Sequence, residues 1–307
     1  MKRIAAVSLC LVTSVILTAG PVMAADPSGA GPASVTGGPS NVGVVIRTPA
    51  EQTFFELKSK IVADYALVRA GTLGRSAFAL ENQAFLAQYG DVTANDIATQ
   101  FATQIANAKV APMATSGTLN MTESPQATSY YCGAAAVYEI LSYLGVTSGP
   151  ANETLTQAHL AGTCSSGYLC TDHLGETPWY YYSGYPHPVL STLNTWKHPM
   201  WYAISSGATN YVSWLTYDVD YHYPLVVGID EAANASTPHL VGHPTNIVIS
   251  HWISASGYRN SGSDTYYADS VHGTSFWSWS KNVPAFSWLP SGNTGMSYLM
   301  RLSGYIG

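Results

Sequence analysis

The stretch that most constrains the fold is residues 126–144, which read Q-A-T-S-Y-Y-C-G-A-A-A-V-Y-E-I-L-S-Y-L. Its apolar residues recur three and four positions apart, a spacing typical of one buried helix face. The pattern predicts a helix that begins near Gly133 and stops at Gly145. Alanines at 134–136 would let its first turn pack closely against a sheet. The apolar positions are Val137, Ile140, Leu141 and Leu144.

Cys132 stands at the N-terminal end of this predicted helix. The unsatisfied backbone N–H groups and the helix dipole favour a negative charge there, so the position favours a thiolate. Because a thiolate is a nucleophile, Cys132 is a candidate for covalent catalysis. The structural alternative is a small apolar cysteine that fills space at a helix end.

The first residues are typical of a secretory signal peptide. The basic pair Lys2 and Arg3 precedes an apolar run over 4–19, and small residues follow up to Ala24. We expect cleavage after Ala24 and a secreted, extracellular protein. A membrane anchor is the weaker interpretation, because a Gly-Pro pair interrupts the apolar run before it could cross a bilayer.

Removal of the signal peptide would take away Cys10 and leave Cys132, Cys164 and Cys170. Cys164 and Cys170 are separated by the five residues S-S-G-Y-L, close enough to form a disulfide in an oxidising compartment. Cys132 is then the odd cysteine. A secreted protein tolerates such a thiol when it is buried and inert, or when it is used for chemistry.

The charge balance argues against two classes of partner. Charged residues make up only 10% of the chain, and the formal net charge is -6. This balance gives no electrostatic footprint for nucleic acid or for an anionic membrane surface. We expect no nucleic-acid partner and no stable membrane insertion.

Composition divides the chain into four parts. We expect a signal peptide over 1–24, a flexible linker over 25–47, a helical segment over 48–110 and a catalytic domain over 118–307. Glycine, proline and serine dominate the linker. A composition break over 111–117 separates the helical segment from the catalytic domain.

Helix signals mark the segment over 48–110. Thr48-Pro49-Ala50-Glu51 is a capping box with proline at the first helical position, and residues at helical spacing follow as far as Gly71. A second helix is predicted over 76–89 and a third from Thr93. Three helices of this size are too small to form a domain alone, so we expect them to pack on another part of the chain. A pro-segment that covers the active site until it is removed is one role for them.

Strand patterns dominate the chain after the first catalytic-domain helix. Runs of β-branched and apolar residues predict strands over 225–229, 247–255, 265–268 and 298–302, with a further helix over 189–196. A helix followed by antiparallel strands is an α+β plan.

Three further residues could complete a thiol active site with Cys132. His251 lies in a predicted strand, where a buried imidazole needs a partner, and it could act as the base. Asp269 ends the next strand and could orient that imidazole, although Asp264 is a second candidate. The side-chain amide of Gln126 could donate to an oxyanion beside the backbone N–H of Cys132. Taken singly, each has an ordinary explanation: a core histidine, a strand-end turn former and a solvated loop glutamine.

The blocks Q-A-T-S-Y-Y-C-G-A-A-A-V, H-W-I-S-A-S-G-Y and Y-Y-A-D-S resemble the cysteine, histidine and aspartate blocks of a known peptidase family. This family is the papain-like peptidases of the bacteriocin-processing, double-glycine type, and the likeness is greatest to secreted relatives without a transporter domain. It covers residues 118–305. It implies a papain-like α+β fold, with an N-terminal helix packed on an antiparallel sheet. By the same likeness Cys132 is the nucleophile, His251 the base and acid, Asp269 the orienting group and Gln126 the oxyanion donor.

The same resemblance implies a cysteine peptidase that needs no cofactor and acts on a peptide or protein substrate. Two alternatives use the same features of the sequence. One is a transglutaminase-like acyl transferase or a cell-wall peptide amidase that works with the same residues. The other is a non-catalytic secreted binding module, with the Tyr- and Trp-rich region as its contact surface.

His239 and His243 lie four residues apart, as in a helical zinc site. Prolines flank the pair, and no glutamate follows His239 as a zinc-peptidase motif requires. We therefore expect no metal site here.

Overall fold

The computed structural model describes residues 35–36, 47–90, 113–162, 164–179, 187–197 and 200–307. Ser34–Gly307 forms one compact unit. The predicted signal peptide, most of the predicted linker and the predicted third helix lie outside the described residues. Among the residues that the structure describes, no helix has both the length and the apolar character to cross a membrane.

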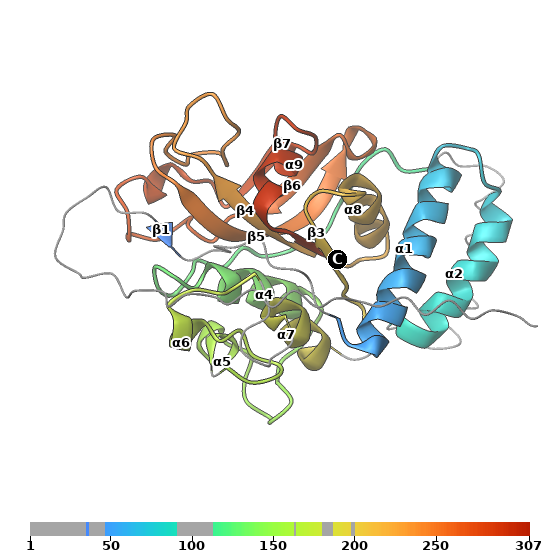
Figure 1. Cartoon of the computed structure of the whole chain (residues 1–307), viewed down its shortest axis with the longest axis horizontal. Helices are drawn as coiled ribbons and strands as arrows, with labels where there is room; N and C mark the ends of the chain where they lie inside the picture. Colours follow the sequence, from blue (N-terminus) through green and yellow to red (C-terminus); the bar gives the residue numbers. More distant parts are fainter. Residues whose placement is uncertain (1–34, 37–46, 91–112, 163, 180–186, 198–199) are drawn as a thin grey trace, which may run out of the picture. The chain divides into compact units, whose positions relative to one another are not determined.

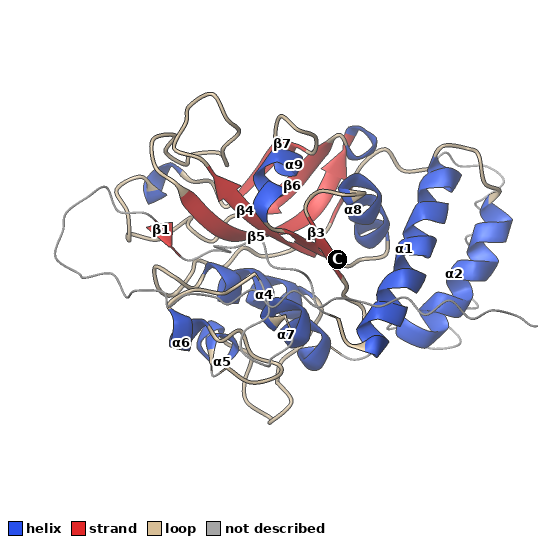
Figure 2. Cartoon of the chain, in the orientation of Figure 1, coloured by secondary structure: helices blue, strands red, loops and turns tan. Residues whose placement is uncertain are grey.

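The described part of Ser34–Gly307 contains an eight-stranded sheet (Figures 1 and 2). All pairings along its main path are antiparallel. Two short strands, β1 (Val35–Thr36) and β2 (Gly117–Thr118), pair with the central strand β5. The main path runs in the order β3 (Ile204–Ser206), β8 (Gly304–Ile306), β4 (Leu225–Glu231), β5 (Ile249–Arg259), β6 (Asp264–Ala268) and β7 (Phe286–Pro290).

Helices pack against this sheet. α4 lies along β5 and β4, with α5 and α7 against α4, whereas α8 contacts β5 and carries α1 on its other side (Figure 1). A helix packed on an antiparallel sheet is the α+β fold that the sequence predicted. The helices are α1 (Pro49–Arg69), α2 (Arg75–Tyr89), α4 (Cys132–Tyr143), α5 (Gln157–Ala161), α6 (Thr171–Leu174), α7 (Pro188–Trp196), α8 (Tyr211–Asp220) and α9 (Met296–Leu299), with short 3-10 turns η1 (Asn260–Gly262), η2 (Ser280–Asn282) and η3 (Met300–Leu302).

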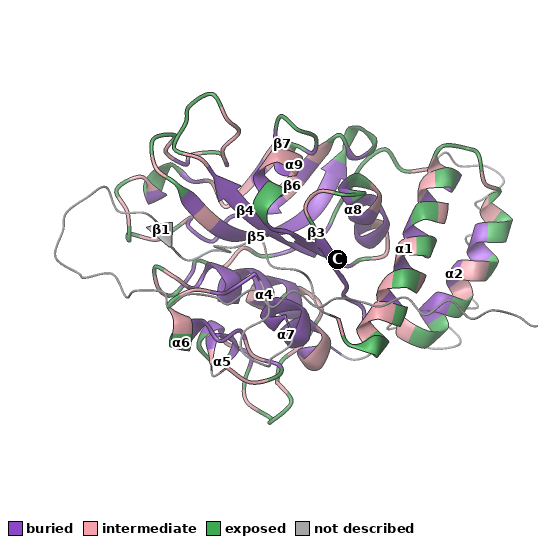
Figure 3. Cartoon of the chain, viewed as in Figure 1, coloured by how far each residue is buried: buried purple, intermediate pink, exposed green. Residues whose placement is uncertain are grey.

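α4 is buried over most of its length, as the purple ribbon in Figure 3 shows. The side chains of its alanines and apolar residues are at most 1% exposed; these are Ala134, Ala135, Ala136, Val137, Ile140 and Leu141. Small side chains in the first turns allow the helix axis to approach β5 closely. The chain leaves the helix at Gly145, whose φ of 75° lies in the left-handed region that glycine adopts without strain. The predicted helix is therefore confirmed.

β5 and β6 form an antiparallel hairpin and correspond to the strands predicted over 247–255 and 265–268. Their register pairs Ser254 with Ala268 and Tyr258 with Thr265. In an antiparallel pair the start of one strand lies beside the end of the next. His251, near the start of β5, and Asp269, just past the end of β6, therefore lie at the same edge of the hairpin.

The predicted strand over 298–302 is wrong. These residues form the end of α9 and the turn η3, and the strand β8 begins only at Gly304. Met296, Leu299 and Met300 are fully buried. Their spacing of three and four positions is helical, and this burial overrides the β-like composition of the run.

The helices α1 and α2 begin and end where the sequence predicted, to within two residues. The capping box at Thr48 is present: its side chain accepts from the backbone N–H of Glu51, and the Glu51 carboxylate accepts from the backbone N–H of Thr48. Thr48 therefore fixes the start of α1.

α1 docks on the rest of the unit through a buried ion pair. Nζ of Lys58 lies 2.8 Å from Oδ1 of Asp218, and neither side chain is exposed. The same ammonium donates to the carbonyl oxygen of Trp201 at 3.0 Å, and the Trp201 indole donates to Oδ1 of Asp218 at 3.0 Å. Burial lowers the pKa of Lys58 to about 8, although the charge of Asp218 opposes this shift.

We predict that Lys58→Ala lowers the free energy of unfolding by about 3–5 kcal/mol, because Asp218 would stay buried without its charge partner. Chemical denaturation followed by tryptophan fluorescence measures the loss. The double variant Lys58→Met, Asp218→Leu removes both charges and should recover most of the stability. Lys60 pairs with Asp64 on the surface, so Lys60→Ala is the control and should lose less than about 1 kcal/mol. Equal losses for the two single variants would contradict the prediction.

Candidate active site

Cys132 is the first residue of α4, and its thiol is buried, with only 2% of the residue exposed. The first N–H groups of a helix have no partner within it, and the dipole is positive at that end. Cys132 therefore stands at the start of the helix, as the sequence predicted.

The structure brings Cys132 and His251 together with Asp269. A hydrogen bond links the imidazole of His251 to Cys132. Nε2 of His251 lies 3.0 Å from Oδ1 of Asp269, so the other ring nitrogen, Nδ1, is the one left to face the sulfur. The backbone N–H of Val271 donates to the same Oδ1 at 3.0 Å and helps to fix the carboxylate.

His251 and Asp269 stabilise each other's charged forms. Burial acts to lower the pKa of His251, but the charge and hydrogen bond of Asp269, with a further contribution from Cys132, raise it to about 10. Burial acts to raise the pKa of Asp269, but the charges of His243 and His251 outweigh it and hold this pKa well below its usual range. His251 is therefore an imidazolium and Asp269 a carboxylate at neutral pH.

A second histidine, His243, lies on the other oxygen of Asp269. Its Nε2 is 3.0 Å from Oδ2 of Asp269, a distance typical of an ion pair but without the alignment of a hydrogen bond. Its Nδ1 is 3.0 Å from Oε2 of Glu231. The side chains of Glu231, His243, His251 and Asp269 are at most 2% exposed. No pattern in the sequence predicts this arrangement, because no short spacing links the end of β4 to the end of β6.

His243, His251 and Asp269 also offer atoms of the kinds that bind metals. Within the described ranges these three residues form a cluster whose nitrogen and oxygen atoms all lie within 4.8 Å of one another. In the structure each histidine Nε2 faces a different oxygen of Asp269 at 3.0 Å. His239, four residues before His243 in the sequence, is not a member of this cluster. Its Nε2 lies 3.1 Å from the carbonyl oxygen of Asn234.

Gln126 is buried, with only 3% of its surface exposed, so it is not a solvated loop residue. Its Nε2 donates to the carbonyl oxygen of Thr128 at 2.8 Å. Its Oε1 accepts from the hydroxyl of Ser270 at 3.2 Å, and its backbone N–H donates to the Ser270 carbonyl at 2.8 Å. The loop that carries Gln126 is thus bonded to the residue that follows Asp269.

Asp264, the second carboxylate considered from the sequence, lies elsewhere. It is the first residue of β6 and accepts from Nε of Arg259 at 2.9 Å and from Asn260 at 2.7 Å. Of the two candidates, it is Asp269 that contacts the ring of His251.

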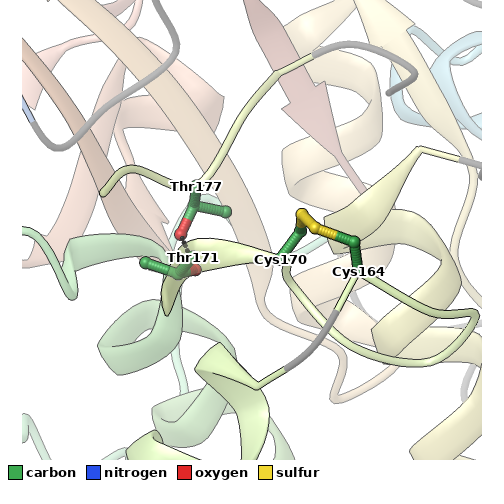
Figure 4. The surroundings of a disulfide bond; sticks show 4 residues. All are labelled: Cys164, Cys170, Thr171 and Thr177. Carbon is green, nitrogen blue, oxygen red and sulfur yellow. Dashed lines mark hydrogen bonds between the residues drawn. A yellow bond between two sulfur atoms is a disulfide. The ribbon is translucent and has the colours of Figure 1, made fainter. Parts of the chain in front are cut away.

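The disulfide predicted between Cys164 and Cys170 is present, and it closes the loop just before α6 (Figure 4). Thr171, the next residue, shares a 2.7 Å hydrogen bond with Thr177, as the dashed line in Figure 4 shows. Both hydroxyls are buried, so this bond holds the two ends of the α6 segment together.

The segment between Thr171 and Thr177 contacts both neighbours of Cys132. The hydroxyl of Tyr131 donates to Oδ1 of Asp172 at 2.5 Å. On the other side, a Cβ atom added to Gly133 would come within 2.3 Å of Oγ1 of Thr177. Glycine follows the cysteine because no larger residue fits against Thr177.

We predict that Gly133→Ala lowers the rate of Cys132 alkylation by iodoacetamide about tenfold or more, because the first turn of α4 or Thr177 must move. Mass spectrometry of the peptide that contains Cys132 measures the rate. Gly292→Ala is the matched control, since a Cβ atom there meets nothing within 4 Å. Equal rates in the two variants would show that the close packing at Gly133 does not position the sulfur.

Comparison with known proteins bears on the whole domain. Residues 118–296 match the model of the Peptidase_C39 like family. No curated protein matches the chain. Among solved structures, the chain is similar to xylellain, a cysteine protease from Xylella fastidiosa, with 12% identity and a TM-score of 0.31 over 63% of this chain and 85% of that one. A likeness of that size carries no weight for the site. The family match spans more than half of the 307 residues, and the chain therefore belongs to the Peptidase_C39 like family of cysteine-type peptidases.

Proposed function

We propose that this protein is a secreted cysteine peptidase of the double-glycine type that hydrolyses peptide bonds with Cys132 as nucleophile and His251 as acid and base. Asp269 orients His251, and Gln126 donates to the oxyanion. The proposal is supported mainly by two buried contacts of His251. Its imidazole is hydrogen-bonded to Cys132, and its Nε2 lies 3.0 Å from Oδ1 of Asp269. A thiol placed at a helix start and paired with an imidazolium is an activated nucleophile.

The first half of the reaction forms an acyl-enzyme. The Cys132 thiolate attacks the carbonyl carbon of the peptide bond, and a C–S bond forms while the carbonyl oxygen becomes an oxyanion. His251 then gives its Nδ1 proton to the amide nitrogen, the C–N bond breaks, and the amine leaves. The neutral imidazole remains oriented by Asp269, whose carboxylate accepts from Nε2.

The second half releases the acid. The neutral Nδ1 of His251 accepts a proton from water as the water oxygen attacks the thioester carbon. The C–S bond breaks, and the thiolate and imidazolium are restored. No metal is needed for this sequence, because the sulfur supplies the nucleophile and the imidazole carries the proton.

The oxyanion needs donors that are fixed before the reaction. The backbone N–H of Cys132 at the start of α4 is one. The side-chain amide of Gln126 is the second. Its Nε2 carries two hydrogens: one is donated to the Thr128 carbonyl, and the other would be donated to the oxyanion. Bonds to Ser270 hold this amide in place.

We expect His251→Ala to lower the alkylation rate of Cys132 at pH 6.5 by about 10- to 100-fold, because a thiol with the ordinary pKa of about 8.5 is only about 1% ionised there. At pH 10 the two proteins should differ little. Asp269→Asn should lower hydrolysis of a fluorescent casein substrate by about 100-fold or more, whereas Asp264→Asn should leave it within about twofold.

These measurements separate the proposed peptidase from the alternatives. A thiol in the native protein that reacts no faster than in the denatured protein would contradict the peptidase and favour a binding module. Casein products that carry an added primary amine would identify an acyl transferase instead.

We also propose that residues 1–24 are a signal peptide that directs export. The supporting features are the basic pair, the apolar run and the small residues before Ala25. N-terminal sequencing of protein recovered from the medium should begin at Ala25. Protein that stays inside the cell with Met1 intact would contradict export.

A further inference from the structure

The mechanism uses one oxygen of Asp269, and the other oxygen faces His243. His243 is itself buried between two carboxylates, those of Asp269 and Glu231. Nothing in the peptidase reaction as described requires this second histidine or its partner. A buried ionisable group next to a catalytic triad calls for a physical explanation.

We propose that His243, held in its protonated form by Glu231, is a positioning residue that fixes Asp269 and sets the lowest pH at which the Cys132–His251 pair becomes reactive. The proposal rests on the proposed function, because the charge of His243 matters in this way only if Cys132 is the nucleophile.

The ring of His243 is fixed from three directions. Glu231, the last residue of β4, accepts from Nδ1 of the ring at 3.0 Å and from the backbone N–H of Leu240 at 2.6 Å. Asp269 lies 3.0 Å from Nε2. The indole of Trp279 packs edge-to-face on the ring, with centroids 4.9 Å apart. The ring therefore has little freedom to rotate away from Asp269.

Both ring nitrogens of His243 face carboxylate oxygens, and only the imidazolium form carries hydrogen on both. A neutral ring would point a lone pair at one of the two carboxylates. Burial acts to lower the pKa of His243, but the charges of Asp269 and Glu231 raise it to about 9. The positive charge thus persists at neutral pH.

The separation of the two histidine rings determines how the charge of His243 acts on the Cys132–His251 pair. The ring centroids of His243 and His251 are 5.7 Å apart. A unit charge at that separation shifts a pKa by about two units at an effective dielectric constant of about 20. The His243 charge disfavours the imidazolium of His251 and favours the thiolate of Cys132. Removing this charge should therefore move the onset of Cys132 reactivity to higher pH.

Other titratable groups surround this network on the elements packed against it; they are Glu123, Glu139, His239, Tyr267 and His272. Burial raises the pKa of Glu123 to about 7 and that of Glu139 to about 8, so both are largely neutral in mildly acidic solution. Burial likewise keeps Tyr267 neutral by raising its pKa. Nδ1 of His239 lies 3.5 Å from Oε2 of Glu231, the oxygen that also contacts His243.

The test measures the alkylation rate of Cys132 from pH 4 to 9 in the intact protein, with iodoacetamide as the probe and mass spectrometry of the Cys132 peptide as the readout. His243→Gln should shift the midpoint of this profile upward by about one pH unit. His239→Gln, in the same loop and beside the same glutamate, should shift it by less than about 0.2 unit. A lower rate at every pH with no shift would mean that His243 only packs, and would overturn the proposal.

A second measurement does not depend on the folding of the His243 variant. Nitrogen NMR of 15N-histidine in the His251→Ala protein should show one ring still protonated at pH 8, which is His243. If no ring is protonated there, the proposal falls. All profiles are repeated with EDTA, and a chelator-dependent midpoint would place a cation, not an imidazolium, beside Asp269 and also overturn it.

The outcomes distinguish this inference from the proposed function. If native Cys132 is no more reactive than in the denatured protein, the peptidase itself is contradicted. If Cys132 is reactive at low pH, depends on His251 and is unaffected by His243→Gln, only the role of His243 is lost.

Discussion

The arrangement depends on one buried carboxylate, that of Asp269, which contacts a histidine through each of its oxygens. Burying a carboxylate without charge partners is strongly unfavourable, so the fold depends on both histidines staying in place. The partners come from β5 and from the loop after β4, and the hairpin register decides whether they meet. A slip of one residue in β5 would turn His251 to the opposite face of the sheet.

The helical pair α1–α2 is linked through α8 to the end of β5 that lies away from His251. Tyr65 and Arg69 of α1 bond to Asp220 at the end of α8, and Asp220 accepts from the hydroxyl of Tyr258 at 2.7 Å. Tyr258 lies seven residues along β5 from His251. These contacts, with the buried pair of Lys58 and Asp218, join α1 to α8 and, through Asp220, to β5.

Local patterns in the sequence predicted α4, the β5–β6 hairpin and the Cys164–Cys170 disulfide, because periodicity and short spacing encode them directly. α8 was missed, since Tyr-Val-Ser-Trp-Leu-Thr-Tyr is rich in residues of low helix propensity and only packing between α1 and β5 makes it a helix. The role of His243 could not be predicted either. It is created by tertiary contacts with Glu231 and Asp269, which no single pattern along the chain connects.

The disulfide has a practical consequence for anyone who handles this protein. It closes the loop that leads into α6, and two residues just beyond that loop, Asp172 and Thr177, contact Tyr131 and Gly133, the two neighbours of Cys132. A thiol reagent added to protect Cys132 from oxidation would also attack the partly exposed Cys164 by thiol–disulfide exchange. Storage under strong reductant would therefore keep the Cys132 thiol reduced while it opens the neighbouring disulfide, so the redox potential of the buffer has to be chosen with both in mind.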